Sequence, residues 1–283
     1  MKNHGSLALV GSGEYLPQMR EFEQSLINDG LANNKKPIYI QIPTAAARES
    51  ENRINYWRSL GEVAAKSLGV TQSFLPIFTR DDANNLKLLK DVDDAALIYL
   101  SGGDPHYLAQ TLRDTLLWDL ILKNWQTGGS LAGCSAGAMA FSGYVPHFRL
   151  SRAQPTQGFG LLNEVRVIPH FDKFFKWIPD SAAKHLLDLP GDSTLIGIDE
   201  DTAVVRRANQ DWQVWGKGKL HLLKGQTPGQ FGAGEFVSVS VFDFGGERWP
   251  KINEALDFFA FFHEPRYALV EVAPIVPQRV EPG

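Results

Sequence analysis

One serine in the sequence lies between two glycines in a pattern typical of hydrolytic nucleophiles. The segment Gly133-Cys134-Ser135-Ala136-Gly137 matches G-x-S-x-G. This pattern suits a sharp turn from a strand into a helix, where side chains two residues before or after the serine would clash. The residues that follow are compatible with a helix, whose N-terminus would stabilise a developing negative charge. We therefore predict that Ser135 is a nucleophile; the alternative is a close-packed, glycine-rich turn.

Cys134 is the second candidate nucleophile, since it also lies between small residues. A cysteine at such a turn would indicate an amidotransferase-like or redox-sensing protein. Gly133 and Gly137 flank Ser135 symmetrically, whereas Cys134 is flanked less well. Lone cysteines are usually buried apolar residues. We therefore favour Ser135, and a single cysteine can form neither an internal disulfide nor a zinc cluster.

His170 is the candidate base among the seven histidines. It follows the strand-like run 165–169, and the carboxyl ends of parallel strands are where catalytic groups gather. His147 lies in a loop rich in proline and phenylalanine, and His185 fits the face of a helix. Position along the chain therefore favours His170.

Three adjacent carboxylates are the candidates for orienting that base. Asp199, Glu200 and Asp201 follow the apolar run 195–198. Adjacent acids normally form a solvated turn, but apolar residues flank these on both sides. At least one carboxylate is then expected to be partly buried and paired. The residues themselves do not choose among the three.

Two glycine-rich turns follow other apolar runs. Gly102-Gly103 comes after residues 95–100, and backbone N–H groups in such a turn can point at a developing oxyanion. Gly11-Ser12-Gly13-Glu14 follows the first apolar run, but Leu16 and Pro17 stand where the dinucleotide-binding pattern would continue. We therefore expect no nucleotide site.

Apolar runs of strand length alternate with helical stretches over the first 200 residues. We expect strands at residues 6–10, 37–43, 74–78, 95–100, 165–169 and 195–198. We expect helices at residues 17–31, 49–68, 81–89 and 106–125. This alternation predicts an α/β fold with a mostly parallel central sheet and helices on both faces.

The pattern changes after about residue 192. Short apolar runs at 202–206, 212–215, 220–223 and 236–242 are separated by turn residues, which predicts antiparallel β-hairpins. A terminal helix is expected at 251–262. No linker divides the chain, so we predict a single domain over residues 1–283, with a core at about 6–205 and a β-rich extension at about 206–273. The aromatic residues of the extension would either fill a core or cover a neighbouring subunit in a homodimer.

Composition excludes several classes of partner. The chain has 28 Lys+Arg against 32 Asp+Glu, a formal net charge of −4, which does not suggest a surface for nucleic acid. No run of 18 apolar residues occurs, and the N-terminal apolar run is too short for a signal peptide. We expect a cytoplasmic protein that binds neither nucleic acid nor membrane.

These motifs together resemble the serine peptidase family that contains cyanophycinase and the aspartyl dipeptidase peptidase E, within the class I glutamine amidotransferase-like folds. The resemblance covers about residues 6–205, and its segments are 10–14, 99–104, 133–138, 169–171 and 197–203. It implies a triad of Ser135, His170 and Glu200, with oxyanion N–H groups from Gly103 and Ala136. It also implies hydrolysis of a small peptide or amide through an acyl-enzyme, with no metal or organic cofactor.

The sequence departs from that family where the substrate would bind. The family's Gly-Gly turn commonly continues with Asn or Gln, but here Asp104 follows. Cyanophycinase-type sites have several arginines just after the histidine, whereas residues 171–177 contain none. We predict Glu14 and Asp104 as substrate-binding residues, and we expect a substrate that is larger or less polar than an aspartyl peptide.

Two other classes of function are compatible with parts of the pattern. An α/β-hydrolase esterase orders its triad serine, acid, histidine, which Ser135, Asp199 or Asp201, and His221 or His263 would satisfy. The run before the serine lacks the usual HGGG-like loop, and His221 lies in a predicted hairpin. A non-catalytic binding protein on the same scaffold is the third hypothesis.

Overall fold

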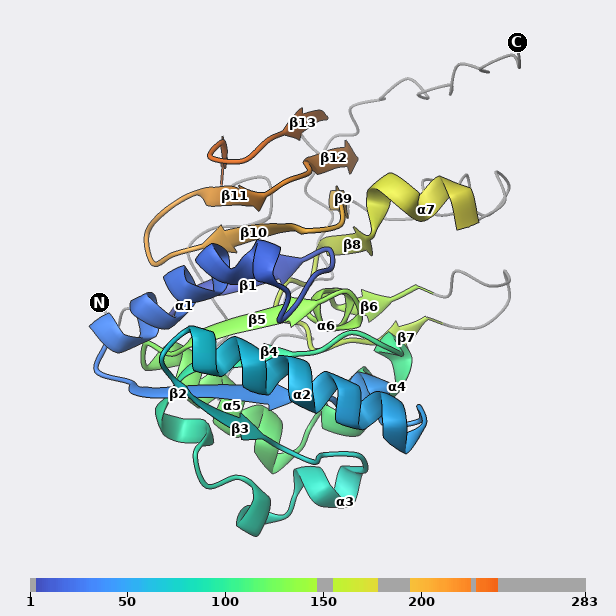
Figure 1. The fold of residues 1–283 in the computed structure, drawn as a ribbon. Helices are drawn as coiled ribbons and strands as arrows, with labels where there is room; N and C mark the ends of the chain where they lie inside the picture. The colour runs from blue at the N-terminus through green and yellow to red at the C-terminus, as the bar shows by residue number, and fades with distance from the viewer. Residues whose placement is uncertain (1–3, 147–154, 178–193, 225–227, 239–283) are drawn as a thin grey trace, which may run out of the picture. The chain divides into compact units, whose positions relative to one another are not determined.

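The computed structural model describes the chain except residues 1–3, 147–154, 178–193, 225–227 and 239–283. Its main feature is an eight-stranded sheet with the order β14-β11-β10-β1-β5-β4-β2-β3 (Figure 1). Its strands are β1 (Leu7–Val10), β2 (Lys36–Ile42), β3 (Thr71–Phe74), β4 (Ala95–Leu100), β5 (Ser130–Cys134), β10 (Thr202–Arg206), β11 (Trp212–Gly216) and β14 (Phe236–Val237). The five strands from β1 to β3 run parallel, and β10, β11 and β14 extend the sheet with antiparallel pairing. The predicted α/β fold with a mostly parallel sheet and C-terminal antiparallel strands is confirmed.

A second, four-stranded sheet has the order β13-β12-β9-β8. Its strands are β8 (Val165–Pro169), β9 (Thr194–Ile198), β12 (Leu220–Lys224) and β13 (Gly229–Phe231). β8 and β9 are parallel, whereas β12 pairs antiparallel with β9 and with β13. A short antiparallel pair joins β6 (Tyr144–Val145) to β7 (Thr156–Gln157).

The strands β11 and β12 do not form the expected hairpin with each other, because they lie in different sheets. The residues that connect them bond instead to the turn that follows β9. The Lys217 N–H donates to the Asp201 carbonyl, and the Gly218 N–H donates to the Thr202 hydroxyl. The Lys219 N–H donates to the Asp199 carboxylate. These bonds direct the chain from one sheet into the other.

Helices cover both faces of the large sheet (Figure 1). Alternate residues of β1 point to opposite faces: Leu7 and Leu9 join one apolar cluster, and Ala8 and Val10 join another. The Ala8 and Val10 cluster includes residues of α1 (Arg20–Ala32) and α2 (Glu51–Ser67). The cluster on the other face includes the second sheet and the helices α4 (Pro105–Leu112), α5 (Leu116–Gln126) and α6 (Ala136–Ala140). Because both faces are buried, the strands show continuous apolar runs rather than alternation.

The expectation of one helix at 106–125 is wrong in one respect: the segment forms two helices, α4 and α5. Asp114 has a φ of 56°, and Thr115 has extended backbone. The Thr115 hydroxyl accepts a hydrogen bond from the Trp118 N–H and so starts the second helix. A threonine with that side-chain bond competes with continuation of the first helix.

Three other expected boundaries were wrong. The strand expected at 74–78 lies at Thr71–Phe74, since Pro76 has no N–H to donate to a neighbouring strand. The helix expected at 81–89 is α3 (Arg80–Ala83) followed by a separate turn, and Thr79 caps it in place of the aspartates. The expected helix at 17–31 begins with a 3₁₀ turn before α1.

The C-terminal expectations fall partly outside the described residues. Of the strand expected at 236–242, the described part pairs only Phe236–Val237 with β11. The helix expected at 251–262 lies outside the described residues. Within Met1–Trp249 the chain forms one compact unit, and a single domain over residues 1–283 stays a prediction. In the described part of the chain, no helix has both the length and the apolar character that a membrane crossing requires.

Candidate active site

Ser135 lies on the sharp turn between β5 and α6. Its backbone has φ 48° and ψ −104°, a conformation that is strained for any residue except glycine. The Ser135 N–H donates to the Val10 carbonyl of β1, which helps hold that conformation. A Cβ atom at Gly133 would lie 2.5 Å from the Gly137 carbonyl carbon. The two glycines of the motif are therefore needed to let the turn close around the serine.

His170 lies between the serine and a carboxylate. Its Nε2 is 3.2 Å from the Ser135 Oγ, and its Nδ1 is 3.0 Å from Glu200 Oε1. Ser135 follows a strand of the large sheet, whereas His170 and Glu200 follow β8 and β9 of the small sheet. With the proton on Nδ1 donated to Glu200, Nε2 is free to accept the serine proton.

The three adjacent acids have three different sets of partners. β9 ends at Ile198, and Asp201 has a φ of 51°, so the acids form a turn. Asp199 accepts from the Lys219 N–H and lies 2.9 Å from the His221 Nε2.

Asp201, the third acid, faces the loop after β1. Its carboxylate accepts from the Gln18 side chain and pairs with the Lys217 ammonium at 3.8 Å. The two outer acids thus have partners of their own, and among these acids only Glu200 contacts His170.

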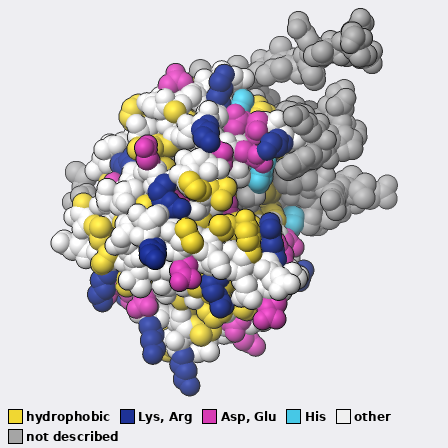
Figure 2. Space-filling view, in the orientation of Figure 1, with side chains coloured by type: hydrophobic (Ala, Val, Ile, Leu, Met, Phe, Trp, Pro, Cys, Tyr) yellow, Lys and Arg dark blue, Asp and Glu magenta, His cyan; other side chains and the backbone are white. Residues whose placement is uncertain are grey.

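Glu200 is also paired with a lysine that the sequence reasoning did not single out. The Lys173 ammonium donates to Glu200 Oε2, and the Asp172 carboxylate accepts from the Glu200 N–H. Both residues belong to α7 (Phe171–Trp177). The available signal was a lysine three residues after His170, in the first turn of a helix that starts directly after that histidine. Figure 2 shows acidic, basic and histidine side chains gathered over the region where Figure 1 places the start of α7.

These contacts shift the pKa of Glu200 below its ordinary value. Partial burial by itself raises the pKa, but hydrogen bonds from Lys173 and from His170 outweigh that effect. The same hydrogen bond raises the pKa of Lys173. The acid is therefore kept ionised, as an orienting carboxylate requires.

Two N–H groups near the serine are available to a ligand. In the described part of the chain, the N–H groups of Gly103 and Ala136 donate to no protein acceptor. Gly103 has a φ of 138°, and a Cβ atom there would lie 2.4 Å from the Ala45 carbonyl oxygen. Both residues stand where the sequence predicted oxyanion donors, and that role stays a prediction.

The two predicted substrate-binding residues are engaged within the protein. Asp104 caps α4, where its Oδ1 accepts from the N–H groups of His106 and Tyr107. Glu14 is 5% exposed, and its oxygens accept from the Gly102 N–H and the Cys134 thiol. These contacts do not favour substrate binding by either carboxylate.

Cys134 is fully buried, with its side chain on the face of the sheet opposite to the helices α4 to α6. Burial raises its pKa well above the ordinary value, and the neighbouring Glu14 carboxylate adds to the shift. A thiolate is therefore disfavoured at this position, which argues against the cysteine as nucleophile.

The other described histidines lie in different surroundings. His221 pairs with Asp199 and packs on the Phe171 ring. The Nδ1 of His106 is 2.8 Å from the Thr156 hydroxyl, and His4 stacks on Trp125. The candidates His147, His185 and His263 lie outside the described residues.

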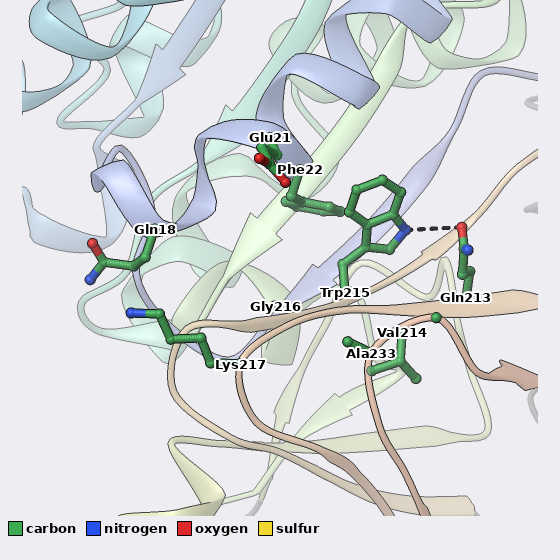
Figure 3. Close-up of a pocket in the computed structure, with 10 residues that line it drawn as sticks. Gln18, Glu21, Phe22, Gln213, Val214, Trp215, Gly216, Lys217 and Ala233 are labelled. Atoms are coloured by element: carbon green, nitrogen blue, oxygen red, sulfur yellow. Dashed lines mark hydrogen bonds between the residues drawn. The ribbon is translucent and has the colours of Figure 1, made fainter.

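A separate groove of about 340 Å³ lies beside α1 and β11 (Figure 3). Its wall carries Trp215, whose ring nitrogen donates to the Gln213 side chain, and Phe22. Gln18 and Lys217, the two groove residues that contact Asp201, lie at its other end. Ser135, His170 and Glu200 do not line this groove.

Known proteins share both the sequence and the fold. The chain is 27% identical to the cyanophycinase of Trichormus variabilis over 230 residues, which cover 77% of this chain and 73% of that protein. It is 27% identical to the cyanophycinase of Geminocystis herdmanii over 232 residues, 78% and 81% of the two chains.

Solved structures are also similar to this chain. A peptidase from an acI-B1 Actinobacterium is 64% identical, with a TM-score of 0.81 over 84% of this chain and 98% of the other. A putative peptidase E protein from Listeria monocytogenes EGD-e, 19% identical, shares the fold with a TM-score of 0.54 over 76% of this chain and all of the other. The match to Peptidase family S51 covers residues 7–212, and the chain belongs to that family.

Proposed function

We propose that this protein is a serine peptidase or amidohydrolase that cleaves its substrate through an acyl-enzyme at Ser135. The observation that carries the proposal is the continuous chain from the Ser135 hydroxyl through His170 to the Glu200 carboxylate. Membership of Peptidase family S51 supports a peptidase.

The geometry supports a sequence of proton transfers. His170 Nε2 accepts the Ser135 proton as the serine oxygen attacks the carbonyl carbon, and the ionised Glu200 stabilises the imidazolium that forms. The N–H groups of Gly103 and Ala136 stabilise the oxyanion. His170 then donates the proton to the leaving amine. In the second half-reaction it activates a water that hydrolyses the acyl-enzyme.

The substrate class is a small peptide or amide. The relatives from Trichormus variabilis and Geminocystis herdmanii are cyanophycinases, so cyanophycin is the first polymer to test. Residues 171–177 contain no arginine, whereas the family's cyanophycin-type sites have several arginines just after the histidine. We therefore propose that the better substrate is a peptide or amide that is larger or less polar than an aspartyl peptide. The cytoplasmic location and the homodimer stay predictions.

The order of the triad along the chain bears on the esterase alternative. An α/β-hydrolase has its acid before its histidine, whereas His170 precedes Glu200 here. Asp199 and His221, which the esterase order would use, contact each other, but the histidine at the Ser135 Oγ is His170. The geometry therefore favours the peptidase-type arrangement.

A fluorophosphonate probe tests the proposal and separates it from a non-catalytic binding protein. The wild type should become labelled at Ser135, and Ser135→Ala should remain folded but unlabelled and lose hydrolysis by a factor on the order of 10⁴. Cys134→Ser is the matched control: it removes the thiol, keeps a hydroxyl that can donate to the Glu14 carboxylate, and should keep most of its labelling at Ser135. An unlabelled wild type, or labelling that is lost in Cys134→Ser and kept in Ser135→Ala, would overturn the assignment of the nucleophile.

A further inference from the structure

Glu14 is a nearly buried carboxylate that belongs to neither sheet. It lies in the loop between β1 and α1, and 5% of its surface is exposed. Its Oε1 accepts from the Gly102 N–H at 2.9 Å, and its Oε2 accepts from the Cys134 Sγ–H at 2.8 Å. A buried carboxylate normally requires such partners, but these two come from different segments of the chain.

Both partners stand directly before residues of the candidate site. Gly102 precedes Gly103, whose N–H is available to an oxyanion, and Cys134 precedes Ser135. One carboxylate therefore ties the turn after β4 to the turn after β5. A Cβ atom built on Gly102 would lie 3.1 Å from Glu14 Oε1 and 3.5 Å from the Ser135 Cβ. Gly102 therefore lies beside both Glu14 and the Ser135 side chain.

A second connection holds the same loop. Tyr15 has a φ of 67°, its N–H donates to the buried Glu23 Oε1, and its hydroxyl lies 2.7 Å from the Ser101 hydroxyl. Glu23 belongs to α1, so the loop after β1 is held at the helix and at the turn after β4. A loop that is fixed at both ends can hold in place the groups that bond to it.

We propose that Glu14 is a positioning residue that sets the distance between the oxyanion donor at Gly103 and the nucleophile Ser135. The inference rests on the proposed function, because only a reacting serine needs that distance. It assigns Glu14 to the geometry of the reaction in place of the substrate binding that its sequence position suggested. A displacement of 1 Å at such a site can cost on the order of 10²-fold in rate.

Variants that change either the length or the charge of the Glu14 side chain distinguish a positioning role from an effect of its charge. Glu14→Gln keeps the length, its amide oxygen can accept from Gly102, and its amide can contact the Cys134 sulfur. Glu14→Asp keeps the charge but is one methylene shorter, so it cannot reach both partners. A substrate-binding carboxylate would show the opposite preference and would act on binding.

The test measures the maximal rate and the half-saturating concentration of fluorophosphonate labelling at Ser135, together with hydrogen exchange of the Gly102 amide. Glu14→Asp and Glu14→Ala should lower the maximal rate by about 10- to 100-fold with the half-saturating concentration little changed. Glu14→Gln should stay within about threefold of wild type. Exchange at Gly102 should be faster in the Asp variant than in the wild type or the Gln variant. Glu21→Ala, which removes an exposed carboxylate from α1, is the control.

Each outcome decides the proposal. If Glu14→Ala does not fold, the Asp and Gln pair decides, since both retain a polar group. Wild-type labelling by the Asp or Ala variant, or a loss in the Gln variant as large as in the Asp variant, overturns it. If the wild type is not labelled at all, the proposed function fails, and the exchange at Gly102 still reports whether Glu14 holds the loop. Unchanged exchange in the Asp variant then overturns the positioning role.

Discussion

Three consecutive carboxylates show that the partners of a residue, and not its type alone, decide which role it can have. Asp199, Glu200 and Asp201 are chemically similar and adjacent, yet their contacts diverge. Glu200 contacts His170 and Lys173, whereas Asp199 joins a histidine and a backbone N–H of the β11–β12 connection. The divergence follows from the turn at Asp201, whose φ of 51° directs the three side chains away from one another.

At the residue scale we expect Glu200→Gln to lower the hydrolysis rate by about 10²- to 10⁴-fold, because an amide does not hold the imidazole in the productive tautomer. Substrate binding should change little. Asp199→Asn is the matched control: it should lower the free energy of unfolding by about 1–3 kcal/mol, since its two partners are partly buried, and leave the rate of the folded enzyme near wild type. Steady-state kinetics and urea unfolding measure the two effects. A larger rate loss in Asp199→Asn than in Glu200→Gln would contradict the choice of acid.

The lysine beside Glu200 gives a prediction about pH. The pKa of Glu200 in the folded protein lies below its ordinary value of 4.5. Its ionised form therefore contributes stability above pH 4.5, and this contribution is lost as the pH falls through the folded pKa. Lys173→Met removes one partner and raises that pKa. The difference in unfolding free energy between wild type and variant should be largest near pH 7 and shrink below pH 4.5.

Urea unfolding at several pH values measures this difference. Lys87→Met, at an exposed lysine outside the site, should show no such pH dependence. A difference that is the same at pH 7 and at pH 3 would show that Lys173 acts by packing and not by its charge.

At the scale of the element, the turn from β5 into α6 depends on glycines that a helix would otherwise disfavour. Alanine is the better helix former by about 1 kcal/mol, yet a Cβ atom at Gly137 would lie 2.6 Å from the Leu100 carbonyl oxygen. We expect Gly137→Ala to lower the free energy of unfolding by roughly 1–3 kcal/mol, as overpacking does, and to slow labelling of Ser135.

Gly232→Ala is the matched control for the glycine substitution. The nearest atom to its added Cβ would be the end of a side chain at 3.4 Å, so its unfolding free energy should stay within about 0.5 kcal/mol of wild type. Urea denaturation measures both variants. A Gly137→Ala protein as stable as wild type would mean that the turn relaxes around the added methyl group.

At the scale of the whole molecule, the site requires two sheets to dock. Ser135 comes from the large sheet, and His170 and Glu200 come from the small one. Ile196 of the small sheet and Trp212 of the large sheet share one apolar cluster. The docking is therefore held by burial of apolar surface, which is not directional, while the hydrogen bonds among Ser135, His170 and Glu200 fix the final distances.

Ile196→Ala removes a fully buried side chain from that cluster. We expect it to lower the free energy of unfolding by about 2–5 kcal/mol, and Leu86→Ala, at an exposed leucine, to change it by no more than about 0.5 kcal/mol. In the wild type, labelling of Ser135 should disappear at the same urea concentration as the tryptophan fluorescence transition. Labelling lost well before that transition would show that the small sheet detaches separately.

The sequence by itself was sufficient for the parts of this protein that depend on local pattern. The small residues around Ser135 predicted the sharp turn that carries it. The strand before His170 predicted the candidate base, and the alternation of apolar runs predicted a parallel sheet. These features follow from steric limits and periodicity within a few residues of each other. Family resemblance supplied Glu200, which the residues around it left open.

Only the tertiary structure decided the contacts between segments that are distant in the sequence. Lys173, Gly102 and Cys134 acquire their partners because distant segments meet at the carboxyl ends of the strands. The tertiary structure also placed β11 and β12 in different sheets, because the residues that connect them bond to the turn after β9 and do not form a hairpin. Glu14 looked like a substrate-binding residue in the sequence and became a buried link in the fold. The physical reason is that burial and pairing depend on what packs against a residue, which local spacing does not determine.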